Sequence, residues 1–175
     1  TNGPRVVPLD AGVLVHTGLP NMGVSKVVKH WRDQWAMLPV PIIFHLVASN
    51  KNDVERGMEI LDNVESVAAV ELGLYDDITP QDAAAFTADA LRHTEKPLLV
   101  RLPLFEADAI AEAVADAGAG VLVIAAAPRG TARHPVTGQL VGGRVYSPTL
   151  KPMALRAVGN IARRRPDVPI VGAGG

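Results

Sequence analysis

Glycines at the end of the chain are the first residues that suggest a chemistry. The apolar run Pro169-Ile-Val171 breaks into Gly172, Ala173, Gly174 and Gly175. An apolar strand that ends in clustered glycines can bring backbone N–H groups close to a phosphate. We therefore predict that Gly174 and Gly175 bind a ligand's phosphate. The alternative is that they only form a tight strand-to-helix turn.

Two polar side chains stand inside apolar runs. Arg101 lies between two apolar residues, where burying its charge without a partner would be costly. It therefore contacts a ligand, forms an ion pair with Glu71 of the neighbouring predicted strand, or does both. His45 is also flanked by apolar residues. It is either a hydrogen-bonded core residue or a ligand contact.

Asp76 and Asp77 directly follow another apolar run. In barrels of alternating strands and helices, catalytic groups stand at the carboxyl ends of the strands. An aspartate there can abstract a proton if burial raises its pKa. We predict Asp76 as the catalytic base, with Tyr75 as the second candidate. The competing interpretation is that residues 76–80 are a solvated cap before a helix.

Other residues give weaker indications of a functional role. Arg129, Arg133 and His134 occupy a glycine-containing loop and either cover an anionic ligand or only aid solubility. No histidines, carboxylates or cysteines show metal-ligand spacing, and no serine lies in a nucleophile-elbow motif. We expect no metal site.

Composition excludes several classes of protein. The chain has 175 residues, a formal net charge of −1 and no cysteine. The lack of excess positive charge argues against a nucleic-acid partner, and the lack of cysteine excludes disulfides, thiolate metal sites and a thiol base within these residues. The apolar runs are too short to span a membrane. We expect a cytoplasmic protein.

These residues need a framework that brings them together. Strand-length apolar runs alternate with segments whose apolar residues fall at helical spacing. The runs predict strands over 42–48, 67–74, 97–102, 121–124 and 169–172. The helical patterns predict helices over about 24–35, 53–63, 80–92 and 106–117 and one through 155–161, with a long irregular segment over 125–152.

Strict alternation of strands and helices indicates right-handed βαβ units and a parallel sheet. The spacing of about 25 to 30 residues between most strands suits a parallel (β/α)8 TIM barrel. Because only about five βα units are visible, we predict an α/β fold in which residues 1–175 form one partial barrel domain. The alternative is an open, flavodoxin-like sheet.

Five short motifs then follow one another with compatible spacing. They are Gly18-Leu-Pro-Asn-Met-Gly23, Glu71-Leu-Gly-Leu-Tyr-Asp-Asp77, Val100-Arg-Leu-Pro103, Leu150-Lys-Pro-Met-Ala-Leu155 and Pro169-Ile-Val-Gly-Ala-Gly-Gly175. This series resembles the dihydroorotate dehydrogenases, which are FMN-dependent (β/α)8 barrels. The resemblance covers nearly the whole chain and implies that it spans roughly the third to the seventh barrel strand.

The resemblance implies FMN as the cofactor and assigns residues to it. Arg101 takes the place of a lysine beneath the pyrimidine edge of the flavin, and His45 lies on a strand that ends facing the flavin. Gly174 and Gly175 would hold part of the phosphate. Ser147 replaces a glycine where the family's backbone approaches the cofactor. We expect these five residues to contact FMN.

Departures from the family's pattern point away from its usual substrate. Asp76 stands where the resemblance places the catalytic cysteine or serine. Asparagines that hold orotate in the family are replaced by Val15, Gly73, Ile78 and Ala125. A site without those amides loses the polar groups that select a planar, amide-rich pyrimidine.

The sequence thus predicts an FMN-dependent oxidoreductase that acts on a small molecule other than orotate. A homodimer is a possible assembly. One alternative is a flavin-free, phosphate-binding lyase or isomerase barrel. The other is a degenerate, non-catalytic homologue that keeps the fold.

Overall fold

Five parallel strands form the larger of two sheets. The computed structural model describes residues 5–18, 20–47 and 50–174. Within them the strands run β3-β4-β5-β6-β9, in chain order and all parallel. Their bounds are β3 (Ile42–Val47), β4 (Val67–Gly73), β5 (Leu98–Pro103), β6 (Val121–Ala126) and β9 (Ile170–Gly172). The five predicted strands are confirmed to within a few residues at each end.

The strand order excludes the flavodoxin-like alternative for this sheet. A doubly wound sheet reverses its strand order at a switch point, whereas each parallel strand here pairs with the next parallel strand along the chain. Within the described residues the sheet is open, with β3 and β9 at its two edges.

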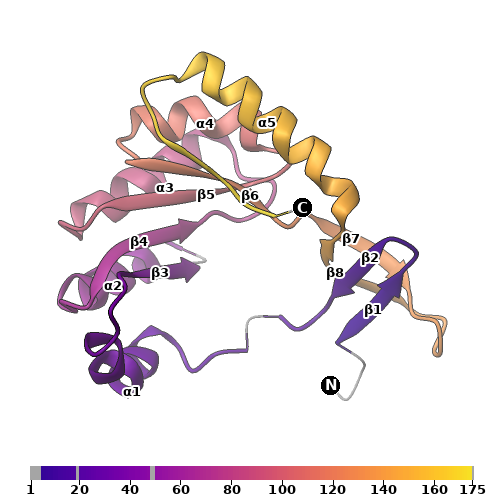
Figure 1. The fold of residues 1–175 in the computed structure, drawn as a ribbon, viewed down its shortest axis with the longest axis horizontal. Coiled ribbons are helices and arrows are strands. Elements are labelled where there is room, and N and C mark those ends of the chain that lie inside the picture. The colour runs from indigo at the N-terminus through magenta and orange to yellow at the C-terminus, as the bar shows by residue number, and fades with distance from the viewer. Residues whose placement is uncertain (1–4, 19, 48–49, 175) are drawn as a thin grey trace.

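Helices join the strands and cover one face of the sheet (Figure 1). They are α1 (Val24–Ala36), α2 (Lys51–Asp62), α3 (Pro80–Arg92), α4 (Ala107–Asp116) and α5 (Lys151–Arg164), the last preceded by the 3-10 turn η1 (Pro148–Leu150). Among the described residues, no helix combines the length and apolar character that a membrane span requires.

The hydrophobic core lies between this helical layer and the sheet. Fully buried side chains such as Met58 of α2, Leu72 of β4 and Ile110 of α4 fill it. The opposite face of the sheet is less covered, because Ile43 and Val47 of β3 are exposed. Within the described residues, β3 is therefore covered mainly on one face.

The segment before α3 caps that helix as the sequence suggests. The Thr79 side chain accepts a hydrogen bond from the Asp82 N–H at 3.1 Å, and Pro80 fills the first helical position. An oxygen that accepts from the first turn satisfies a donor with no partner in the helix. The cap is thus Thr79, which leaves the Asp76 side chain for another role.

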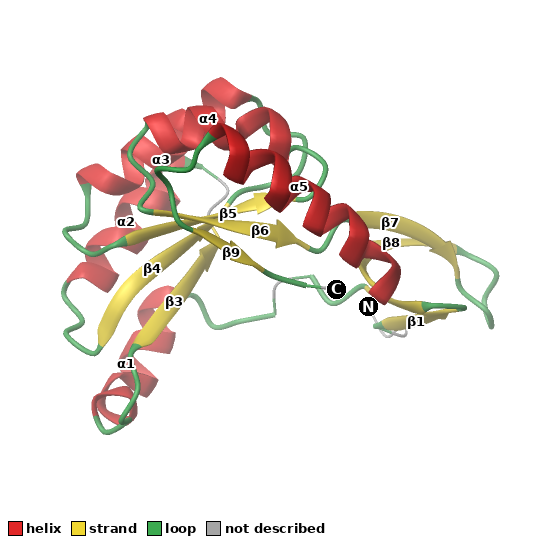
Figure 2. Cartoon of the chain, turned by 45° about the horizontal axis from the view of Figure 1, so that its top comes forward, coloured by secondary structure: helices red, strands yellow, loops and turns green. Residues whose placement is uncertain are grey.

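A second, antiparallel sheet of four strands was not predicted. It is ordered β1-β2-β8-β7, from β1 (Val6–Leu9), β2 (Gly12–Val15), β7 (Arg129–Arg133) and β8 (Leu140–Tyr146). The supposed irregular segment 125–152 therefore contains a hairpin. Figure 2 shows this sheet beyond the carboxyl ends of the parallel strands.

Local sequence conceals this sheet for a physical reason. Strand β7 reads Arg-Gly-Thr-Ala-Arg, and Gly142 and Gly143 lie within β8, so neither strand shows a clear apolar alternation. Gly143 is required where β8 meets β2, since a Cβ there would lie 2.7 Å from Leu14 Cδ2 and closer still to the Val15 carbonyl oxygen.

Candidate functional site

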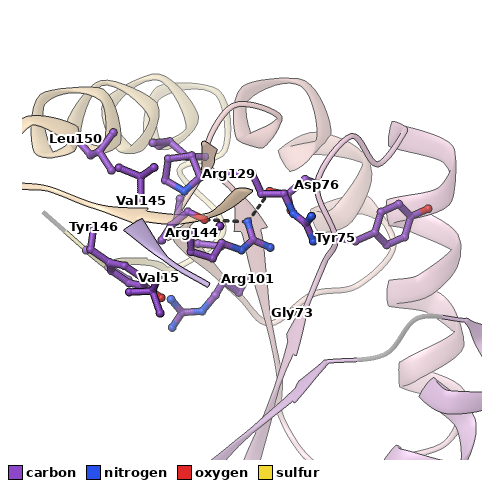
Figure 3. Close-up of a pocket in the computed structure, with 18 of the residues that line it drawn as sticks. Val15, Gly73, Tyr75, Asp76, Arg101, Arg129, Arg144, Val145, Tyr146 and Leu150 are labelled. Carbon is purple, nitrogen blue, oxygen red and sulfur yellow. Dashed lines mark hydrogen bonds and ion pairs between the residues drawn. The ribbon is translucent and has the colours of Figure 1, made fainter. Parts of the chain in front are cut away.

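A cavity of about 1260 Å³ lies between the two sheets, at the carboxyl ends of the parallel strands (Figure 3). Its walls come from β3, β4 and β5, from the segments after β6 and β9, and from β2 and β8. The carboxyl ends of parallel strands are where α/β proteins usually bind ligands. The described site residues predicted from the sequence all line it: His45, Tyr75, Asp76, Arg101, Ser147 and Gly174. Gly175 lies outside the described residues.

Glu71 of β4 joins two cavity residues from the strands on either side. Arg101 Nε donates to Glu71 Oε1 at 2.8 Å, and Nη2 donates to Oε2 at 3.1 Å. On the other side, His45 Nδ1 lies 2.6 Å from Oε1. The predicted ion pair between Arg101 and Glu71 is confirmed, while contact of Arg101 with a ligand stays a prediction.

Opposing effects act on the pKa of Glu71. Its burial raises the pKa, but hydrogen bonds from His45 and Arg101, together with their charges, lower it to about 2 from an ordinary value of 4.5. Glu71 is therefore ionised at neutral pH and acts only as a hydrogen-bond acceptor.

The glycine at position 73 makes room for His45. Glu71 and Gly73 are two residues apart on β4, so they face the same side of the sheet. A Cβ on Gly73 would lie 2.8 Å from Cε1 and 3.1 Å from Nε2 of His45. The His45 side chain is 46% exposed and lines the cavity, so it is hydrogen-bonded but lies at the cavity wall and not in the core.

Asp76 is paired to the antiparallel sheet. Its Oδ1 accepts from Arg144 Nη1 of β8 at 2.6 Å, and its Oδ2 accepts from Arg129 Nε of β7 at 3.1 Å (Figure 3). Arg144 Nη1 also donates to the Ala127 carbonyl oxygen at 2.8 Å. Asp76 thus ties the loop after β4 to the second sheet; its prediction as a base is not tested by this geometry.

Sequence reasoning missed Arg144. It lies in the segment expected to be irregular, and only the pairing of β8 with β2 carries it to the cavity. No local pattern around it indicated this. Of the three cationic loop residues, Arg129 lines the cavity, whereas Arg133 and the buried His134 bond within their own hairpin.

Tyr75 and Ser147 line the cavity, but the Tyr75 ring is directed away from its arginines and the Ser147 hydroxyl is hydrogen-bonded to the backbone. The Tyr75 ring packs edge-on against Phe86, with centroids 5.8 Å apart, and points away from Arg101 and Arg144 (Figure 3). The Ser147 hydroxyl donates to the Ala11 carbonyl and accepts from the Thr149 N–H at 3.2 Å. Their predicted catalytic and cofactor roles are untested.

Gly174 has a backbone conformation that favours glycine, and its predicted contact with a phosphate stays a prediction. Its φ is +89°, and an added Cβ would meet nothing nearer than the Ala125 carbonyl oxygen at 4.0 Å. Its N–H has no acceptor among the described residues. The position is therefore open toward the cavity.

One group of side chains could hold a metal ion, and it lies outside this cavity. Glu55 and Glu59 of α2 and His93 after α3 place ligand atoms within 4.8 Å of one another among the described residues. Both glutamates are exposed. The expectation of no metal site is therefore untested.

A parallel sheet whose strands pair in chain order, with helices on one face, defines an α/β fold, and its charged cavity lies where such folds usually bind ligands. The family follows from sequence: the family model described as dihydroorotate dehydrogenase matches residues 1–175, and the chain belongs to this family. The resemblance seen in the five motifs is confirmed.

Individual relatives agree with the family. The chain is 31% identical over 189 residues to a dihydroorotate dehydrogenase B (NAD(+)), catalytic subunit, of Pelobacter propionicus, covering 98% of this chain and 62% of the relative. It is 29% identical to a protein of the same name from Staphylococcus carnosus, covering 98% and 61%. The chain therefore spans about three fifths of the length of these relatives.

A solved structure supports the fold alone. The crystal structure of a phosphonopyruvate hydrolase superposes with a TM-score of 0.54 at 14% identity, covering 88% of this chain and 60% of that one.

Proposed function

We propose that this chain forms part of an FMN-dependent oxidoreductase that acts on a small molecule other than orotate. The observation that carries the proposal is the position of Arg101, fixed on Glu71 and facing a cavity at the strand ends of a dihydroorotate dehydrogenase family member. When bound, FMN would supply the redox chemistry, which no side chain here can supply.

The residues of the cavity fit this cofactor. Arg101 Nη1 has no acceptor among the described residues, although Nε and Nη2 are held by Glu71. A guanidinium fixed in this way can stabilise negative charge on an electron-rich ring edge. The open N–H of Gly174 suits a phosphate oxygen. The cavity volume of about 1260 Å³ leaves room for a cofactor and a substrate together.

A barrel domain is the proposed context for these strands. We infer that residues 1–175 form part of a (β/α)8 barrel and contribute roughly its third to seventh strands. Strands that pair in chain order, with helices on one face, are arranged as they are in such a barrel.

The lining of the cavity supports a substrate other than orotate. Val15, Gly73 and Ala125 replace asparagines expected from the family resemblance, and all three line the cavity. Ile78, the fourth such position, is buried. None offers an amide, so a substrate rich in ring amides would leave its own polar groups unpaired.

The flavin content of the purified protein tests the proposal. The complete product of the gene that encodes these residues should bind about one FMN per chain, released on denaturation and identified by its mass. A protein that takes up no added FMN would instead support the non-catalytic alternative. The phosphonopyruvate hydrolase likeness does not favour a flavin-free lyase, because at 14% identity it concerns the fold alone. The expected homodimer and cytoplasmic location stay predictions.

A further inference from the structure

The protonation of the His45 ring follows from its contact with Glu71. Glu71 is ionised and can only accept a hydrogen bond, so the 2.6 Å contact with His45 Nδ1 requires the proton on Nδ1. In the neutral ring Nε2 then carries a lone pair. A carboxylate that fixes the tautomer of a histidine leaves the other nitrogen ready to accept a proton.

The position of Nε2 follows from Gly73. The imidazole occupies the space that any side chain at position 73 would fill, with Nε2 only 3.1 Å from where that Cβ would lie. Position 73 itself lines the cavity. Nε2 therefore has no acceptor or donor among the described residues and lies at the cavity wall.

Other proton acceptors along the same wall are less suited. Both oxygens of Asp76 accept from guanidinium groups, so this carboxylate is already engaged. His16 lines the cavity, but its ring has no orienting partner among the described residues.

We propose that His45 accepts a proton from the cavity's ligand through Nε2, and that Glu71 is the positioning residue that holds its ring. The ligand would present an N–H, an O–H or an acidic C–H bond to this nitrogen. In the transfer that bond breaks, its electron pair stays on the ligand, and a new N–H bond forms at Nε2. The resulting imidazolium keeps its Nδ1–H on the Glu71 carboxylate, which balances its charge.

The catalytic role of His45 rests on the proposed function, but the experiments that test the inference do not require bound flavin. The charged groups that face His45 are Glu71 from β4 and, across that carboxylate, Arg101 from β5. Among the described residues of its own strand, the neighbours on its face, Ile43 and Val47, are apolar. The tautomer of the ring is therefore set mainly by its contact with Glu71.

Two measurements on the complete protein test the inference. The first is ¹⁵N NMR of ring-labelled histidines, which identifies the tautomer. We expect the neutral His45 ring to carry its proton on Nδ1, and Glu71→Gln to abolish this preference. The second is acylation by diethyl pyrocarbonate, which attacks unprotonated imidazole nitrogens and is located by mass spectrometry. We expect His45 to react at Nε2, and at least fivefold more slowly in Glu71→Gln.

Matched variants separate a specific effect from a loss of folding. Gly73→Ala should displace the ring and remove its Nδ1–H tautomer. Gly142→Ala, also in the cavity wall but with its nearest heavy atom 3.9 Å away, should leave the tautomer and reactivity of His45 unchanged. His16 provides the internal standard for acylation.

The outcome with FMN identifies the source of the proton. Protection of Nε2 by FMN alone would assign the donor to the cofactor, and continued reactivity in FMN-loaded protein would leave Nε2 to the substrate. A His45 ring protonated on Nε2 in the neutral form, or equal acylation in wild type and Glu71→Gln, would overturn the proposal. Neither result depends on whether FMN binds.

Discussion

Glu71 and Arg101, on neighbouring parallel strands, form a two-point ion pair through both carboxylate oxygens at 2.8 and 3.1 Å. The same carboxylate holds His45. Two residues from the strands that flank β4 therefore depend on one buried side chain.

Glu71→Gln should destabilise the protein by about 1–3 kcal/mol, because the Arg101 guanidinium would lose its charged acceptor in a partly buried position. Urea unfolding measures this difference. Asp33→Asn serves as the control, since the pair of Asp33 with Arg32 is exposed and 3.7 Å long; it should cost less than about 0.5 kcal/mol. Equal effects of the two substitutions would contradict the assigned role of Glu71.

The free energy of unfolding should decrease at acidic pH as Glu71 becomes protonated. Its pKa in the folded protein, about 2, lies below its ordinary value of 4.5, so its contribution is complete above pH 4.5. That contribution is lost as the pH falls from 4.5 through about 2. The loss amounts to about 3 kcal/mol. Unfolding free energies measured at a series of pH values should fall less steeply at acidic pH in Glu71→Gln than in wild type. Identical pH dependence in the two proteins would show that the Glu71 ion pair does not cause the loss of stability.

Asp76→Asn should loosen the antiparallel sheet, because its two charge-assisted hydrogen bonds join that sheet to the loop after β4. We expect amide hydrogen exchange in β7 and β8 to rise about tenfold, which corresponds to about 1.4 kcal/mol of local opening. Asp77→Asn is the control. Asp77 has a positive φ of 62° that asparagine tolerates, and its carboxylate has no partner among the described residues.

The same variant separates two roles for Asp76. A proton acceptor would lose its activity with the carboxylate while the exchange rates stayed constant. A tether would change the exchange rates even without a ligand. Unchanged exchange in Asp76→Asn would contradict the tether and favour the predicted role of Asp76 as a base.

Gly143→Ala should weaken the contact of β8 with β2, since its methyl group would meet the Val15 carbonyl and the Leu14 side chain. The expected cost is about 1–3 kcal/mol, with faster exchange in β2. Gly142→Ala should stay within about 0.5 kcal/mol of wild type, because its Cβ has ordinary contacts. Equal free energies of unfolding for the two variants would contradict the close approach of β8 to β2.

The contrast between the two sheets explains how much the sequence could predict. Each parallel strand is a mainly apolar run, and local periodicity reveals a helix between each of these strands and the next parallel one, so the strands and, in a barrel, their order could be inferred. The pairing of Arg101 with Glu71 then followed from adjacent strands. Strand β8 pairs with β2 across about 130 residues of chain and carries two glycines and an arginine, so no local rule indicated it.

The cavity shows the same division. The predicted residues on and after the parallel strands all line one cavity, because the carboxyl ends of such strands meet at one edge. The partners of Asp76 could not be inferred, since they come from the unpredicted sheet. The position of the His45 ring could not be inferred either, because it depends on the absence of a side chain at Gly73 on the neighbouring strand.

FMN titration of the complete gene product, compared with Arg101→Met and Arg129→Met, tests the central claim most directly. Both arginines line the cavity, but Arg101 is held by Glu71 and is the residue that would contact FMN, while the Arg129 side chain is 76% exposed. We expect stoichiometric binding in wild type, at least tenfold weaker binding in Arg101→Met and less than a threefold change in Arg129→Met. Absence of FMN binding by a folded wild-type protein, or equal binding by all three, would contradict it.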